Sequence, residues 1–223
     1  MVEGIVFDMD GVLLDTETQG MALTIRLAAK LGYAMAPEIY RQSLGAPGQR
    51  SGELFRSFLG QDYPHEEISR LYWEECTALA RQDRTPKKPG LGECLAGLRG
   101  RGLPLALATS TPRKVVEIYL EHIPQMHGAF DAVVCGTDVA KGKPAPDIFL
   151  RAAEEIGIAP ERCLGVEDSH NGLLALKAAG IPAVMIPDLI PYEGLKELVT
   201  YHLSSLTELL PLVDSLNGEG PKA

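Results

Sequence analysis

The stretch Gly4-Ile5-Val6-Phe7-Asp8-Met9-Asp10-Gly11 decides how this chain folds and where its chemistry lies. Residues 4–7 are a short β-branched and aromatic run typical of a strand, and Gly11 interrupts the pattern before a helix can begin. Asp8 and Asp10 are therefore expected at the carboxyl end of the first strand, the edge where open α/β sheets bind ligands. Because two like charges this close require a cation or a shared proton, the stretch favours a metal site with a carboxylate nucleophile.

Beyond this stretch the chain alternates between strand and helix patterns. Apolar runs bounded by turn residues predict strands at 103–109, 131–135, 162–167 and 182–187. Helical spacing of apolar residues separates them. This alternation predicts an α/β fold, a Rossmann-like doubly wound parallel sheet.

Residues 16–88 break the alternation, because they show helical spacing and no strand pattern. The apolar positions of one such helix are Ile68, Leu71, Tyr72, Cys76 and Leu79. We therefore predict a helical-bundle cap domain at 16–88, inserted after the first strand into a core domain made of 1–15 and 89–216. Residues 217–223 are expected to be a frayed tail.

Composition narrows the function classes. The chain has 223 residues, of which 45% are hydrophobic and 23% charged, and no uncharged apolar run reaches the roughly 18 residues of a membrane span. No secretion signal is recognised, so a cytoplasmic protein is expected. A net charge of −9 argues against nucleic-acid binding. The four cysteines form no CxxC pair, which favours buried thiols over a zinc site.

Three further motifs follow predicted strands or precede predicted helices. Thr109-Ser110-Thr111 places hydroxyl and amide groups at a helix start, which suits a phosphate. Lys143 lies in a loop between Gly142 and Pro144, where its ammonium group can meet an anionic oxygen. Glu167-Asp168 ends another strand with hard oxygen ligands of the kind that Mg²⁺ prefers.

Each of these motifs also has an ordinary structural explanation. Taken alone, the Thr-Ser-Thr run is more often helix capping, Glu167-Asp168 is as often a turn or cap, and a loop lysine is usually solvated. The Asp8/Asp10 pair is harder to explain by turn chemistry. Because all four motifs fall at one predicted edge of the sheet, a shared active site is the better interpretation.

In these motifs the chain resembles the haloacid dehalogenase superfamily of hydrolases, in the subfamily I branch with a helical cap after the first strand. Asp8-Met9-Asp10-Gly11-Val12 matches the first family motif, Thr109 the second, Lys143 the third and Glu167-Asp168 the fourth. The resemblance covers nearly the whole chain.

The resemblance implies a role for each matched residue. Asp8 is implied as the nucleophile that forms an aspartyl-phosphate, and Asp10 as the general acid and then the general base. Thr109 and Lys143 are implied to hold phosphoryl oxygens. Mg²⁺ is implied as the cofactor, bound by the Asp8 carboxylate, the Asp10 backbone carbonyl and Asp168, with Glu167 as a direct or outer partner.

Within the superfamily, Asp10 and the acidic fourth motif argue against a dehalogenase, which lacks the second aspartate. The chain is also similar to β-phosphoglucomutase, but it carries Thr18-Gln19-Gly20 where that mutase has a histidine. The expected function is therefore a phosphatase acting on a small phosphorylated metabolite such as a sugar phosphate. Two alternatives stay open: a β-phosphoglucomutase-like phosphoryl transferase and a receiver-type phospho-aspartate domain.

The sequence offers fewer signals for substrate specificity. Ser110, next to the second motif, and Glu17, Gln49, Arg50 and Trp73 of the cap are the candidate substrate contacts. A small phosphorylated substrate is the expected partner, and the protein is expected to be a monomer or a weak homodimer.

Overall fold

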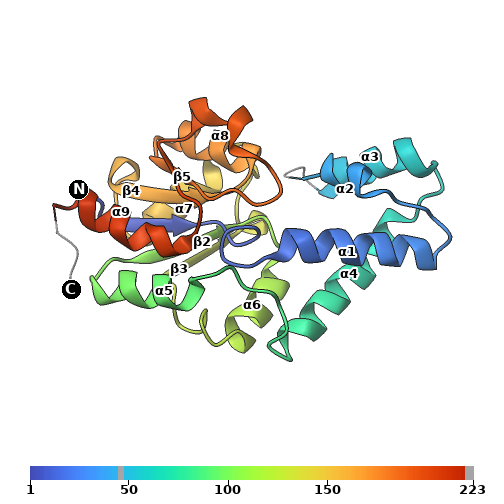
Figure 1. The fold of residues 1–223 in the computed structure, drawn as a ribbon, viewed down its shortest axis with the longest axis horizontal. Helices are drawn as coiled ribbons and strands as arrows, with labels where there is room; N and C mark the ends of the chain where they lie inside the picture. The colour runs from blue at the N-terminus through green and yellow to red at the C-terminus, as the bar shows by residue number, and fades with distance from the viewer. Residues whose placement is uncertain (45–47, 219–223) are drawn as a thin grey trace.

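The computed structural model describes residues 1–44 and 48–218, with side chains described at all of these except 48 and 49. Its centre is a six-stranded parallel sheet in the order β3-β2-β1-β4-β5-β6 (Figure 1). The strands are β1 (Gly4–Phe7), β2 (Leu105–Thr109), β3 (Ala132–Cys135), β4 (Cys163–Glu167), β5 (Ala183–Met185) and β6 (Tyr201–His202). The predicted doubly wound α/β fold is confirmed.

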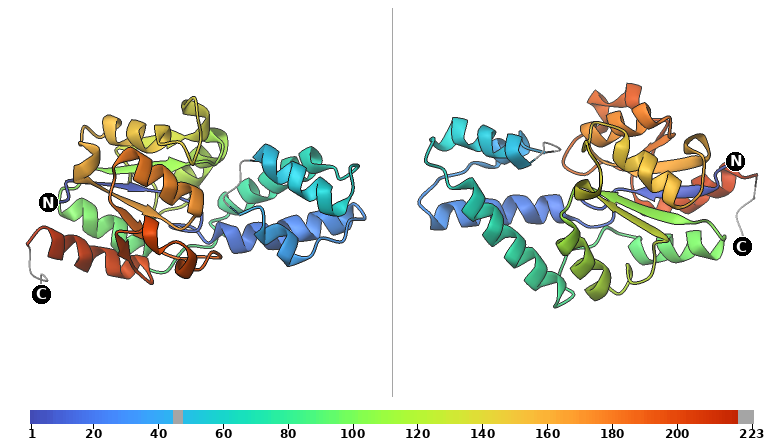
Figure 2. Two further views of the ribbon diagram at one scale, coloured as in Figure 1. Left: turned by 90° about the horizontal axis from the view of Figure 1, so that it is seen from above. Right: turned by 180° about the vertical axis from the view of Figure 1, so that it is seen from behind.

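Nine α-helices of the described chain surround or extend this sheet. They are α1 (Thr16–Lys30), α2 (Pro37–Arg41), α3 (Gly48–Leu59), α4 (His65–Ala80), α5 (Leu91–Gly100), α6 (Arg113–His122), α7 (Asp147–Glu155), α8 (His170–Ala179) and α9 (Leu209–Leu216). Helices α5, α6 and α9 lie on one face of the sheet, and α7 and α8 lie on the other (Figures 1 and 2).

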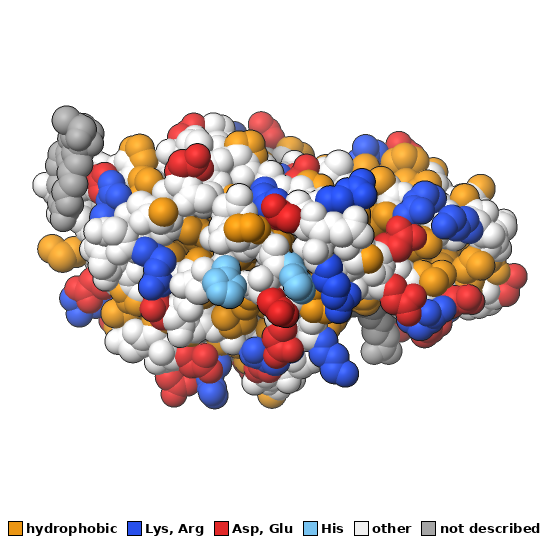
Figure 3. All heavy atoms as spheres, turned by 90° about the horizontal axis from the view of Figure 1, so that it is seen from below, with side chains coloured by type: hydrophobic (Ala, Val, Ile, Leu, Met, Phe, Trp, Pro, Cys, Tyr) orange, Lys and Arg blue, Asp and Glu red, His pale blue; other side chains and the backbone are white. Residues whose placement is uncertain are grey.

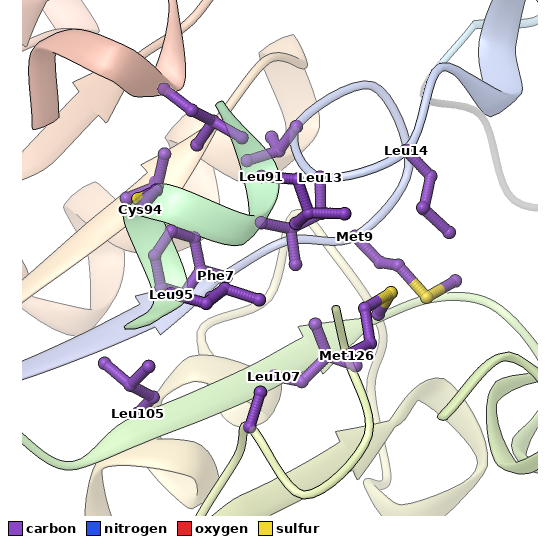
Figure 4. Packing of buried hydrophobic residues seen from close by; sticks show 14 of the residues in the cluster. Phe7, Met9, Leu13, Leu14, Leu91, Cys94, Leu95, Leu105, Leu107 and Met126 are labelled. Atoms are coloured by element: carbon purple, nitrogen blue, oxygen red, sulfur yellow. The ribbon is translucent and has the colours of Figure 1, made fainter. Parts of the chain in front are cut away.

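Side chains that alternate along the central strands form two hydrophobic cores. Phe7 and Leu107 belong to the cluster beneath α5 and α6, which also contains Leu95 and Met126 (Figure 4). The intervening Val6, with Ala106 and Ala108 of β2, packs in the second cluster with residues of α7 and α8. Both faces of the sheet are therefore covered, which explains the continuous apolar runs of its strands.

Helices α1 to α4 extend beyond the carboxyl ends of the strands and have a hydrophobic cluster of their own (Figure 2). This third cluster contains Leu27, Met35, Phe55, Tyr63 and Ile68. The chain enters this layer of helices after β1 and returns to the sheet before α5. The helical layer thus stands over the edge where the predicted site residues gather.

Some details differ from the sequence prediction. Strand β6 was not predicted, because it contains only two residues and lies at the edge of the sheet. At the start of the predicted tail, the Asn217 side chain bonds the backbone of Val2 on both its N–H (2.7 Å) and its carbonyl (3.0 Å), so the chain is anchored at this residue. Residues 219–223 lie outside the described part of the chain. All four cysteines are buried and free, as predicted.

Two surface features complete the description. Within residues 1–44 and 48–218, no helix combines the length and the apolar character that crossing a membrane requires. On the face shown in Figure 3, Lys and Arg side chains alternate with Asp and Glu rather than gathering in one field.

A substitution at Gly165 can test how closely α8 packs against β4. A Cβ atom at this position would lie 2.2 Å from Cδ2 of Leu176, inside a well-packed core. We expect Gly165→Ala to lower the free energy of unfolding by about 1–3 kcal/mol, because overpacking forces neighbouring side chains to move. Urea denaturation measures the change.

Gly100→Ala is the matched control, because a Cβ atom at Gly100 would meet no atom within 4 Å. We expect it to be neutral or to stabilise the protein by up to about 1 kcal/mol. Equal destabilisation by both substitutions would contradict the packing argument.

Candidate active site

A cavity of about 520 Å³ lies between the carboxyl ends of the strands and the helical layer. Residues of the sheet edge, among them Asp8, Lys143 and Asp168, line one side of it. Glu17 and Trp73, from α1 and α4, line the other. The cavity therefore lies at the position where a parallel α/β sheet places its ligands.

Asp8 follows directly after β1 and is almost completely buried. Its backbone N–H donates to the carbonyl of Val166 at 2.9 Å, which joins it to β4. Burial raises the pKa of Asp8 well above its usual value; Lys143 opposes this shift, and the charges of Glu167 and Asp10 add to it. A charged Asp8 therefore depends on nearby cations.

Lys143 is the cation in contact with Asp8. Its ammonium group donates to Asp8 Oδ1, to Glu167 Oε1 at 2.8 Å and to the carbonyl of Ala108 at 3.1 Å. All three N–H groups are thus used. Burial acts to lower the pKa of Lys143, but the charges of Asp8 and Glu167 outweigh it and raise the pKa above its usual value. The lysine therefore remains charged although it is buried.

Glu167 is the most deeply buried carboxylate of the site, with 1% of the residue exposed. Its second oxygen accepts hydrogen bonds from the backbone N–H groups of Asp168 (2.9 Å) and Ser169 (2.8 Å) and from the Ser169 hydroxyl (2.9 Å). Both oxygens of Glu167 are therefore occupied, one by Lys143 and the other by these donors. This arrangement favours an orienting role over direct metal binding.

Asp168 and Gly11 lie against each other across the site. A Cβ atom at Gly11 would be 2.3 Å from Oδ2 of Asp168, and Gly11 has a φ of +78°. Glycine is thus required here for both space and backbone conformation. Burial, and then the charges of Glu167 and Asp8, raise the pKa of Asp168 well above its usual value. Asp168 lines the cavity, where its carboxylate oxygens can meet a ligand.

Asp10 accepts hydrogen bonds from three threonine hydroxyls. Thr16, the first residue of α1, donates to Oδ1 at 2.6 Å, and Thr111 and Thr109 donate to Oδ2 at 2.6 and 3.3 Å. The Thr109 hydroxyl also accepts from the N–H of Thr111 at 3.1 Å. Thr109 is fully buried and does not line the cavity, whereas Thr111 does. In this structure Thr109 orients Asp10 and the following loop.

The candidate specificity residues occupy different environments. Glu17, Trp73 and Ser110 line the cavity. Burial, and then the charge of Asp10, raise the pKa of Glu17 to about 8. Arg50 is exposed in the first turn of α3 and is not among the lining residues. The side chain of Gln49 lies outside the described part of the protein.

Three contributors were not named as site residues from the sequence: Thr16, Tyr40 and Tyr72. Thr111 was recognised as part of the Thr109-Ser110-Thr111 motif, but its hydrogen bond to Asp10 was not predicted. The sequence signal for both threonines was a hydroxyl group near Asp10. Thr16 is close to Asp10 along the chain, and Thr111 approaches it across the edge of the sheet. Tyr40 and Tyr72 line the cavity from α2 and α4. Their sequence positions carry no signal, because only the packing of the cap helices brings them to the cavity.

The charge balance of the cavity fits a divalent cation. Five carboxylates line it, and Lys143 is its only Lys or Arg among the described residues. No group of three or more His, Cys, Asp or Glu side chains in this part of the chain is arranged to hold a metal by itself. Mg²⁺, however, typically uses one or two carboxylates and completes its shell with water and substrate oxygens. The hard oxygens of Asp8 and Asp168 match that requirement.

Comparison with known proteins gives the family. Residues 2–180 match the family model of haloacid dehalogenase-like hydrolases. The chain is 31% identical to the putative phosphatase YhcW of Bacillus subtilis, over 98% of this chain and 100% of that protein. It is also 31% identical to the phosphorylated carbohydrates phosphatase of Thermotoga maritima, over 82% of this chain and 84% of that protein.

A solved structure agrees with these relatives. The crystal structure of CbbY from Rhodobacter sphaeroides in complex with phosphate superimposes with a TM-score of 0.81 at 31% identity, covering 94% of this chain and 96% of CbbY. The match extends over sheet and helical layer alike, which a receiver-type domain would not give. The predicted resemblance and the predicted enzyme class, a phosphomonoester hydrolase, are confirmed: the chain belongs to the haloacid dehalogenase-like hydrolase family.

Proposed function

We propose that this enzyme is an Mg²⁺-dependent phosphatase that hydrolyses a small phosphorylated metabolite through an aspartyl-phosphate on Asp8. The observation that carries the proposal is the buried contact of Lys143 with Asp8 and Glu167, beside an Asp10 held by three hydroxyls. The names of two relatives, a phosphorylated carbohydrates phosphatase and a putative phosphatase, support this class.

In the first half-reaction, a carboxylate oxygen of Asp8 attacks phosphorus and the bond from phosphorus to the leaving oxygen breaks. Asp10 donates a proton to that oxygen, which leaves as an alcohol. Lys143 reduces the repulsion between the anionic nucleophile and the phosphate. Ser110, which lines the cavity, can donate a hydrogen bond from its hydroxyl to a phosphoryl oxygen.

In the second half-reaction, water attacks the phosphorus of the aspartyl-phosphate. Asp10, now ionised, accepts a proton from the water, and the bond between phosphorus and Asp8 breaks to release inorganic phosphate. The threonine hydroxyls around Asp10 keep its carboxylate in one place for both steps. Positioning of this kind supplies much of the catalysis in phosphoryl transfer.

Asp8, the backbone carbonyl of Asp10 and Asp168 would hold Mg²⁺, and Glu167 would orient them through its bonds to Lys143 and the backbone of Asp168. When bound, the ion supplies positive charge that neutralises the substrate phosphate and the surrounding carboxylates. Without such charge, five lining carboxylates would repel a phosphate dianion.

The helical layer acts in this proposal as a cap domain over residues 16–88, on a core made of 1–15 and 89–216. Its separate hydrophobic cluster supports that division. A cap that closes on the cavity would exclude bulk water from the reaction. The cytoplasmic location and the monomeric or weakly dimeric state stay predictions.

Removing the nucleophile tests the chemistry. Asp8→Asn should lower phosphate release by about 1,000-fold or more, because the amide cannot form the acyl phosphate. The measurement is release of inorganic phosphate from a panel of sugar phosphates, nucleotides and phosphorylated acids with Mg²⁺. Asp62→Asn, at an exposed carboxylate of the helical layer, is the control and should remain active. An active Asp8→Asn enzyme would reject the nucleophile assignment.

Metal binding can be tested by thermal unfolding without an activity assay. The raised pKa values of buried Asp8 and Asp168 mean that, in the metal-free protein, stability is lost as pH rises through those values. Mg²⁺ should offset this loss, so at about 100 times its Kd it should raise Tm by roughly 5–10 °C. Because both pKa shifts are upward, the increase should become larger as the pH is raised. Asp168→Asn should remove the increase; an unchanged increase would contradict the assignment.

The position of Glu167 can be tested through Gly172 in the first turn of α8. A Cβ atom there would lie 1.6 Å from Oε1 of Glu167. Gly172→Ala should displace this carboxylate from Lys143 and lower kcat/KM by about 100-fold, the effect of roughly 1 Å of misplacement. His170→Ala, at an exposed site of the same turn, should change kcat/KM less than threefold. Similar losses in both variants would instead indicate a general effect on α8.

A further inference from the structure

Gly20 of α1 makes room for two tyrosine hydroxyls beside the cavity. A Cβ atom at Gly20 would lie 2.7 Å from the hydroxyl oxygen of Tyr40 and 3.0 Å from that of Tyr72. These tyrosines belong to α2 and α4, and both line the cavity. The absence of a side chain at position 20 therefore brings two hydroxyls from different helices to the same point.

Glu17 lies one turn earlier on α1 and joins this group. Tyr40 also lines the cavity, and its hydroxyl acts to lower the pKa of the Glu17 carboxyl group. Glu17 is also close to Asp10, whose negative charge contributes to raising the pKa of Glu17. Asp10 is the proposed proton donor to the leaving oxygen, so Glu17 and Tyr40 lie where the remainder of the substrate must be.

The neighbouring wall of the cavity is apolar and aromatic. Trp73 packs edge-on against Tyr72 with ring centroids 4.7 Å apart, and Phe55 and Ile68 also line this side. An apolar wall with a few fixed polar groups is typical of sites that orient a small ligand. Here the polar groups are one carboxylate and two phenol hydroxyls.

This side of the cavity is poorly suited to a second anionic group on the substrate. In the described chain Lys143 is the only lining Lys or Arg, and Asp8 and Glu167 already engage it. Within the helical layer, the residues whose side chains are not described, 45–49, read Gly-Ala-Pro-Gly-Gln and include no basic residue. His65, the other lining residue able to carry positive charge, packs against Phe55 with ring centroids 5.9 Å apart.

We propose that Glu17, Tyr40 and Tyr72, in the space left by Gly20, form a specificity site for an uncharged, hydroxyl-rich leaving group. The substrate class is accordingly a sugar or polyol monophosphate rather than a bisphosphate or a phosphorylated acid. This inference rests on the proposed phosphatase function and deepens it.

The chemistry of recognition follows from the donors and acceptors present. The Glu17 carboxylate accepts hydrogen bonds from substrate hydroxyls, and each phenol can donate or accept. The C–H faces of a sugar can lie against Trp73. A second phosphate would find no cationic partner among the described residues on this side of the cavity. An aryl leaving group would leave the polar groups unpaired, which is costly in a closed site.

The matched substrates are fructose 6-phosphate and fructose 1,6-bisphosphate, which differ by one phosphate group. Glucose 6-phosphate and ribose 5-phosphate extend the sugar set, and p-nitrophenyl phosphate serves as a reference without hydroxyls. Binding is measured by calorimetry on Mg²⁺-loaded Asp8→Asn protein, so the result does not depend on turnover. We expect at least tenfold tighter binding of fructose 6-phosphate than of the bisphosphate.

Variants of the site identify the residues responsible. Glu17→Gln and Tyr40→Phe, combined with Asp8→Asn, should each reduce the preference for fructose 6-phosphate over p-nitrophenyl phosphate by about tenfold or more. Gly20→Ala should do the same by displacing both hydroxyls. Tyr33→Phe is the control, because Tyr33 is hydrogen-bonded to Asp62, away from the cavity, and should keep the preference. Circular dichroism verifies that each variant is folded.

Three results would overturn the inference: equal or tighter binding of the bisphosphate, no binding of any sugar monophosphate at millimolar concentration, or an unchanged preference in Glu17→Gln and Tyr40→Phe. Phosphate release by the unmodified enzyme decides the proposed function separately. Selective binding without any release would keep the specificity site and reject the phosphatase; release without selective binding would do the opposite.

Discussion

The buried ammonium group of Lys143 is the interaction on which the site depends. It joins Asp8 after β1, the carbonyl of Ala108 in β2 and Glu167 at the end of β4, so three neighbouring strands meet at one charge. Burial raises the pKa of Asp8 and the charge of Lys143 acts to lower it, so an ionised Asp8 depends on this lysine. Lys143 therefore both joins the strands at this edge of the sheet and favours the ionised form of Asp8.

Close approach at glycines completes this arrangement. Gly11 allows Asp168 to lie against the loop after β1, and Gly172 allows Glu167 to lie under α8. Even so, Lys143 balances only part of the negative charge that lines the cavity. The remaining negative charge explains why a hard cation fits the site. In the proposed mechanism the cation would offset this charge, so that a phosphate could bind beside carboxylates that would otherwise repel it.

The sequence predicted that residues at strand ends would lie together, and the structure brings them to one cavity, while their roles stay predictions. The proximity of Asp8 and Asp168 was predictable because they follow β1 and β4 and the carboxyl ends of parallel strands share one edge. Lys143 was predictable from its loop motif between Gly142 and Pro144. The burial of Thr109 against Asp10 and the contribution of Tyr40 were not predictable in this way. They depend on how loops and cap helices pack, and no periodicity in the sequence encodes those contacts.

Helix α1 connects the chemistry to substrate recognition within two turns. Its first residue, Thr16, donates a hydrogen bond to Asp10, Glu17 lines the cavity, and Gly20 leaves room for two tyrosine hydroxyls. Because these residues share one rigid helix, a movement of the helical layer that displaces Glu17 also displaces the hydroxyl that holds Asp10. In the proposed mechanism this shared helix would couple proton transfer by Asp10 to recognition of the leaving group, because a substrate that does not engage α1 would not stabilise the position in which Thr16 holds Asp10.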